Sequence, residues 1–116
     1  MPNNSTQLVN MIDHDIFSEM REMLEDEFDE LLEEFKEDTQ ATLVQLNDAV
    51  KKGELERISG LCHTLASSSG HLGFLQLSQI AREIELMARE QHQGNYVELV
   101  DQLKQCYQQL IQELEA

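Results

Sequence analysis

The chain has 116 residues, 41% of them hydrophobic, which suffices for one domain with a real core and is too few for two ordinary domains. Its formal net charge of −15 at pH 7 argues against nucleic acid or membrane partners, because a strongly acidic surface repels phosphate backbones and anionic lipids. One Pro, five Gly and no Trp, with abundant Leu, Glu and Gln, are a helical composition. We therefore expect a single all-α domain.

The two cysteines and the N-terminal residues bear on the cellular compartment of the protein. Cys62 and Cys106 lie in helical patterns, and we expect two small core side chains in a reducing cytosol rather than a disulfide framework. No apolar run approaches the roughly 18 residues of a membrane span. Residues 1–10 are polar and lack the basic start and apolar stretch of a signal peptide, so we expect a flexible N-terminus there. These features predict a cytoplasmic protein.

The first two predicted helices are bounded by capping residues. Apolar side chains at helical spacing begin a short helix near residue 12, which Asp13 or Asp15 could cap and which ends near residue 24. A second helix is expected over residues 26–52, and Gly53 is a natural stop. Its predicted buried stripe consists of Phe28, Leu31, Leu32, Phe35, Thr39, Thr42, Leu46, Ala49 and Val50.

The start of the second predicted helix is strongly acidic. Residues 25–38 hold nine carboxylates against a single cation, Lys36. Acidic side chains in the first turns complement the helix dipole. A solvated outer face is the default interpretation of such a charge run, and a docking surface for a basic partner is the alternative.

Three further helices are expected, and only short links separate them. The apolar spacing predicts helices over residues 54–70, 74–90 and 95–114. Short links make consecutive helices antiparallel neighbours. We therefore predict an all-α, antiparallel up-down four-helix bundle with an extra short N-terminal helix laid over one end, occupying residues 11–116. The buried stripe predicted for residues 74–90 consists of Leu77, Ile80, Ala81, Ile84, Met87 and Ala88.

Residues 60–73 present one histidine on a helix face without bulky side chains. At about 100° per residue, His63 lies opposite an apolar face, so we expect it to point away from the core into solvent. A large partner could reach such a ring. The apolar face consists of Ile58, Leu61, Leu65 and Leu72, and the helical neighbours of His63 are Glu56, Ser59, Gly60, Ala66, Ser67 and Gly70.

Residues 63–73, His-Thr-Leu-Ala-Ser-Ser-Ser-Gly-His-Leu-Gly, resemble the signature of histidine-containing phosphotransfer (HPt) domains. That signature runs His-x-Leu-Lys-Gly-Ser-Ser/Ala, with a Gly ten residues after the His. Ala66 stands where the family usually has Lys, and Ser67 where it usually has Gly. The resemblance covers nearly the whole chain. The matching residues are His63, Leu65, Ser68, Ser69, Leu72 and Gly73.

The resemblance implies a phosphoryl carrier. His63 would accept a phosphoryl group, on Nε2, from the receiver domain of a hybrid histidine kinase and pass it to the aspartate of a response regulator. The surroundings of the phosphate and of the docked partner would be Ser59, Gly60, Ala66, Ser67 and Gly70.

The residues permit this chemistry but do not generate the phosphate. A neutral imidazole near pH 7 is a competent nucleophile, and phosphoryl transfer needs chiefly an in-line approach. The chain has neither a Gly-x-x-x-x-Gly-Lys loop nor a kinase Gly-rich loop, so we expect no autonomous kinase activity and no cofactor. Mg²⁺ would come with the partner receiver domain. We expect no metal site, because His63 and His71 are about 12 Å apart along a continuous helix.

The two departures from the signature bear on efficiency. A Lys one turn after the His would offset the charge of the phosphate, and Ala66 cannot. The loss of one exposed cation–phosphate contact costs on the order of 1 kcal/mol, which weakens transfer without forbidding it. The hydroxyl of Ser67 could crowd the partner slightly or donate a hydrogen bond to the phosphate.

Two other functions share part of this sequence pattern. The first is a non-catalytic HPt-like module that docks a receiver or kinase and regulates it without accepting phosphate; Ala66 favours it slightly, and the presence of His63 argues against it. The second is the dimerisation and phosphoacceptor hairpin of a histidine kinase, in which an acidic residue and then a Pro typically follow the His. Here Thr64 follows, and the predicted helix has no Pro. We expect a monomer, because one exposed histidine with a clear approach does not require pairing.

Overall fold

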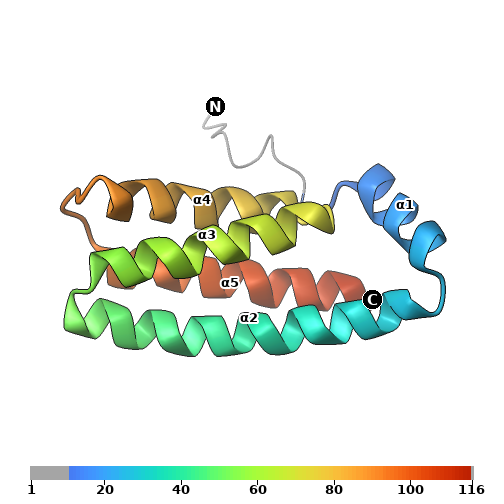
Figure 1. The fold of residues 1–116 in the computed structure, drawn as a ribbon, viewed down its shortest axis with the longest axis horizontal. Helices are drawn as coiled ribbons and strands as arrows, with labels where there is room; N and C mark the ends of the chain where they lie inside the picture. The colour runs from blue at the N-terminus through green and yellow to red at the C-terminus, as the bar shows by residue number, and fades with distance from the viewer. Residues whose placement is uncertain (1–10, 116) are drawn as a thin grey trace.

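The protein is described by a computed structural model over residues 11–115, which there forms five helices and no strand (Figure 1). Each predicted helix is present, with ends within two residues of those expected from the sequence. The expected flexibility of residues 1–10 lies outside the described residues, as does Ala116. The helices are α1 (His14–Leu24), α2 (Glu27–Lys52), α3 (Leu55–His71), α4 (Leu75–Arg89) and α5 (Tyr96–Glu115).

Helices α2 to α5 run up and down beside one another, and α1 lies across one end of the bundle (Figure 1). Short turns join consecutive helices, which forces each to reverse direction. At the end opposite α1, Gly53 adopts a φ of 67° and its amide donates to the carbonyls of Ala49 and Val50, ending α2 as predicted. The predicted architecture is confirmed.

The start of α1 is tied to the link between α3 and α4. The Asp13 carboxylate caps α1 by accepting from the amides of Asp15 and Ile16 at 3.0 and 3.2 Å. The Asp13 amide donates to the Gly73 carbonyl at 2.7 Å. Gly73 has a φ of 84°, and a Cβ at this position would lie 2.9 Å from the Asp13 carbonyl oxygen. Glycine is therefore needed ten residues after His63 because the chain turns sharply there against α1.

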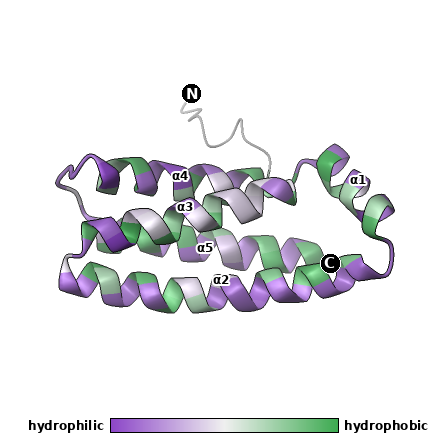
Figure 2. Cartoon of the chain, viewed as in Figure 1, coloured by the Kyte–Doolittle hydropathy of each residue, from purple (hydrophilic) through white to green (hydrophobic). Residues whose placement is uncertain are grey.

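The core is continuous through the four long helices, with hydrophobic residues on their inner faces and hydrophilic residues on much of the outer surface (Figure 2). Four aromatic rings pack where α1 meets the bundle. The ring centroids of Phe17 and Phe28 are 5.1 Å apart, those of Phe17 and Phe74 are 5.9 Å apart, and those of Phe35 and Phe74 are 5.1 Å apart. This cluster holds α1 over the ends of α2 and α4.

The core includes two buried residues that the predicted stripes of α2 and α4 omitted. In α2, Leu43 is buried, although the predicted stripe omitted it. In α4, Glu85 is 1% exposed, on the face expected to be wholly apolar. None of the helices within residues 11–115 is long and apolar enough to cross a membrane.

Candidate functional site

His63 stands near the middle of α3, with its ring exposed and one ring nitrogen held by α4. Its side chain is 60% exposed, and Nδ1 lies 2.8 Å from Oε2 of Glu85. The predicted exposure is confirmed, and the contact between one ring nitrogen and α4 was not predicted from the sequence. Because a carboxylate only accepts, Nδ1 must carry the proton in this bond. The lone pair of a neutral ring then resides on Nε2, which is the nucleophilic nitrogen.

Glu85 is the buried anchor of this arrangement. Its Oε2 also accepts from Nη2 of Arg89, one turn further along α4, while its Oε1 is buried and has no partner among the described residues. Burial pushes the pKa of Glu85 upward. The hydrogen bond from His63 and the charges of His63, Arg89 and Arg82 outweigh burial, so the pKa of this carboxyl is lowered. Glu85 is therefore ionised at neutral pH.

Neither Glu85 nor Arg89 was among the site residues predicted from the sequence. One signal was available, because Glu85 falls at helical spacing from Ala81 and Ala88, on the apolar face of α4. An acidic residue at such a position needs a partner, since an unpaired buried charge is costly. The sequence alone did not show that the partner is His63, 22 residues earlier.

The predicted surroundings of His63 are only partly on the open surface. Gly60 and Ser67 are exposed and Ser59 is half-buried. Ala66 is 1% exposed, which corrects its predicted place on the open face of α3. At Gly70, a Cβ would lie 3.2 Å from Oγ of Ser78, so this glycine permits close contact between α3 and α4.

A partly polar depression of about 290 Å³ adjoins the His63 face. It includes Ser59, one turn before His63 on α3, and Arg89, whose side chain is 58% exposed. Arg89 is therefore a cation within reach of the site that the sequence analysis did not place there. The depression is lined by Leu55, Glu56, Ser59, Ala88, Arg89 and Gln91.

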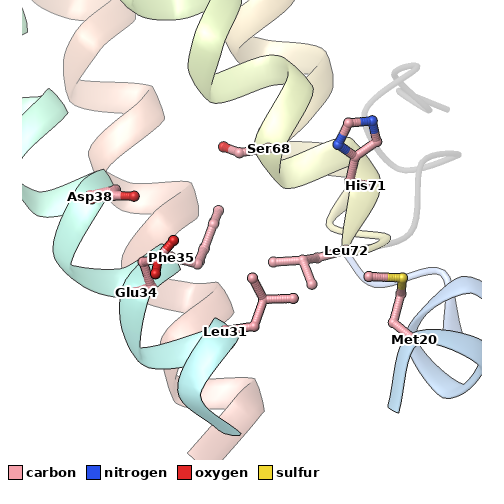
Figure 3. Close-up of a pocket in the computed structure, with 8 residues that line it drawn as sticks. All are labelled: Met20, Leu31, Glu34, Phe35, Asp38, Ser68, His71 and Leu72. Atoms are coloured by element: carbon pink, nitrogen blue, oxygen red, sulfur yellow. The ribbon is translucent and has the colours of Figure 1, made fainter. Parts of the chain in front are cut away.

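A second hollow, of about 360 Å³, lies between α1, α2 and the last turns of α3 (Figure 3). Its walls are mostly apolar, with Glu34 and Asp38 contributing acidic groups. Ser68 and His71 line it from α3, about 7 and 12 Å along the helix axis from His63. We call it the apolar groove, and its lining residues are Met20, Leu31, Glu34, Phe35, Asp38, Ser68, His71 and Leu72.

Three other reactive side chains, Cys62, Cys106 and Ser69, are buried and therefore unavailable for this chemistry. Cys62 and Cys106 are free and buried, and burial raises their thiol pKa values to about 12 and about 11, the charge of Glu85 adding to the effect at Cys62. Ser69 is buried and donates to the Leu65 carbonyl at 2.6 Å. Within residues 11–115, no group of three or more His, Cys, Asp or Glu side chains is arranged to hold a metal ion.

Comparison with known proteins gives a family and a fold. A sequence model of the Hpt domain matches residues 30–113. The structure of histidine-containing phosphotransfer protein B (HptB) from Pseudomonas aeruginosa PAO1 superposes with a TM-score of 0.84 at 23% identity, covering 86% of this chain and 87% of that protein. No curated protein sequence matches significantly.

Yeast Ypd1 is similar in fold over a smaller share of its length. In its co-crystal with the receiver domain of the response regulator Ssk1, Saccharomyces cerevisiae Ypd1 superposes with a TM-score of 0.67 at 24% identity, covering 80% of this chain and 65% of that one. Another Ypd1 structure gives the same TM-score at 25% identity and 60% coverage of the yeast chain. This chain thus spans less than two thirds of the yeast protein.

Proposed function

Because the chain belongs to the Hpt domain family, we propose that it carries phosphoryl groups on Nε2 of His63 between receiver domains of a phosphorelay. The donor is the receiver of a hybrid histidine kinase, and the acceptor is the aspartate of a response regulator. The observation that carries the proposal is the bond from Nδ1 of His63 to buried Glu85, which leaves Nε2 with the lone pair on an exposed ring.

The residues of this chain hold and orient the nucleophile. Nε2 of His63 attacks the phosphorus of an aspartyl phosphate, so an N–P bond forms, the P–O bond breaks, and the aspartate leaves as a carboxylate. The proton stays on Nδ1, where the Glu85 carboxylate offsets the positive charge of the phosphorylated ring. Transfer to the next aspartate is the reverse reaction. Mg²⁺ belongs to the receiver in both steps.

The apolar groove supports a receiver as the partner. Ypd1, which shares the fold, has been crystallised with a receiver domain. The groove begins at Ser68, about 7 Å along the axis of α3 from His63, so a partner that contacts both would extend along the last turns of α3. An apolar floor beside Glu34 and Asp38 suits one amphipathic helix of the receiver with basic flanking residues.

The test of the carrier function is direct. The full chain is incubated with phosphorylated receivers and hybrid kinases from the same cell, and acid-labile phosphate is mapped by mass spectrometry. We expect phosphate on His63 and none in His63→Gln. His92→Gln is the matched control, because His92 lies in the exposed link before α5, and it should label like the wild type.

Two results would contradict this. If no cognate donor labels the chain although receiver binding is intact, the docking-only function is the better one, and the absence of the family's Lys at Ala66 already favours it slightly. Label on a serine would overturn both functions.

The docking surface is tested separately from the chemistry. Leu31→Asp places a charge in the apolar groove and should weaken receiver binding at least about tenfold, while His63 stays reactive toward the small donor phosphoramidate. Val44→Asp is the control on the same helix, because Val44 is 69% exposed and outside the groove. Equal receiver affinity of the two variants would exclude the groove as the docking surface.

A further inference from the structure

Position 66 cannot supply the cation that the family signature places beside the phosphate. Ala66 has no charge, and its side chain is 1% exposed. The rest of the chain makes this lack more serious, because the net charge is −15 and Glu56 lies next to the site. A phosphoryl group adds between about one and two negative charges near neutral pH. A phosphorylated His63 therefore needs a cation from elsewhere in the molecule.

Arg89 is placed to be that cation. Its guanidinium and the His63 ring bind the same oxygen of Glu85, so the two side chains are separated by a single acceptor atom. Arg89 is 58% exposed and borders the same depression as Ser59, one turn before His63. A guanidinium offers paired donors that match phosphate oxygens, and its long side chain can be repositioned without moving the helix.

We propose that Arg89 leaves Glu85 and binds the phosphoryl group when His63 is phosphorylated. Arg89 would then take the place of the cation that is absent at position 66. This proposal rests on the proposed carrier function. The exchange keeps charges paired at each stage. Before transfer, Glu85 is paired with Arg89 and accepts from the neutral ring. After N–P bond formation the ring with its Nδ1 proton is positive and remains bound to Glu85, while Arg89 is free to neutralise the phosphoryl oxygens.

The exchange is tested on the full chain without a protein partner. Phosphoramidate phosphorylates the protein, and ³¹P NMR follows the pH titration of the phosphohistidine. A bound guanidinium favours the more highly charged phosphoryl form, so Arg89→Gln should raise the titration midpoint by about 0.5–1 pH unit. Arg89→Lys should raise the titration midpoint by less than Arg89→Gln does, because lysine keeps the positive charge. Lys104→Gln, which removes one charge from α5, should titrate like the wild type.

A second measurement needs no substitution. In ¹H–¹⁵N spectra of the wild type, the Arg89 side-chain resonance should shift on phosphorylation, whereas that of Arg57, which is paired with Asp48 and Glu54, should not. Equal titration midpoints in Arg89→Gln and Lys104→Gln, or an unmoved Arg89 resonance, with His63 phosphorylated, would overturn the exchange alone. Failure of phosphoramidate to label His63 in the wild type would overturn the exchange together with the carrier function.

Discussion

The contact between α3 and α4 is built in two different ways along its length. Toward the C-terminus of α3, small side chains bring the helices together: Oγ of Ser78 donates to the Ala66 carbonyl at 2.8 Å, and Gly70 lies directly against Ser78. In the middle of α3, the contact is made by a buried carboxylate, Glu85, which holds His63 and Arg89. We call these the closed end and the charged end.

The two regions differ in the kind of polar group that lies between α3 and α4. At the closed end, neutral hydroxyls bond to nearby carbonyls, so close contact costs little desolvation. At the charged end, a carboxylate is kept from water and one of its oxygens has no partner among residues 11–115. The bond it makes to His63 fixes the tautomer and orientation of an otherwise exposed ring. We infer that the charged end is shaped for reactivity and the closed end for stability.

The largest expected effect is at the turn that continues the closed end. Gly73→Ala should lower the free energy of unfolding by about 2–3 kcal/mol, because alanine disfavours a φ of 84° and its Cβ would meet the Asp13 carbonyl at 2.9 Å. Urea denaturation followed by circular dichroism measures the loss. Gly53→Ala is the control, since it shares the positive φ of 67° but meets nothing within 4 Å. If both variants lose the same free energy of unfolding, the contact of the new Cβ with the Asp13 carbonyl does not contribute to the destabilisation of Gly73→Ala.

A smaller, pH-dependent effect is expected at the charged end. Glu85→Gln should cost about 1–2 kcal/mol at pH 7, because a charged acceptor is replaced by a neutral one in a buried hydrogen bond. The folded-state pKa of Glu85 lies below its ordinary value of 4.5, so the carboxylate stabilises the fold above that pH. This contribution is lost as the pH falls from about 4.5 through the lowered folded-state pKa.

Denaturation curves from pH 7 down to pH 3 test this assignment. The wild type should lose stability faster than Glu85→Gln below about pH 4.5, so the difference between them should shrink there. Two curves that stay parallel throughout would mean that Glu85 is not held as a carboxylate by His63 and Arg89.

The smallest expected effects are changes in stability when either of two glycines of α3 is replaced by alanine. Gly60→Ala should stabilise the protein by about 0.5–1 kcal/mol, because alanine favours the helix and its Cβ would meet nothing within 4 Å. Gly70→Ala should gain less or nothing, since its Cβ would lie 3.2 Å from Ser78 Oγ. Thermal denaturation of both variants measures the difference. The same gain at both positions would contradict close contact at the closed end.

Local chemistry made the helices and the exposed histidine predictable from the sequence. Helical periodicity, a cap at Asp13 or Asp15 and the Gly53 stop depend on neighbours within a few residues; the periodicity and the stop are confirmed, and the structure selects Asp13 as the cap. The exposure of His63 followed from the same periodicity, and the residues after it resembled the family signature whose domain model matches the chain. The phosphoacceptor role of His63 remains a prediction until phosphate is mapped.

What the sequence did not show depends on how helices are paired. A helical wheel assigns one buried face to α3, but α3 contacts both α2 and α4, and this buries Ala66 and brings Gly70 against Ser78. The partnership of Glu85 with His63 and the apolar groove arise the same way, from side chains distant in sequence. Periodicity fixes the angle of each side chain about its own helix axis. Only the tertiary structure decides which neighbouring helix faces a given side chain, and which residue of that helix lies beside it.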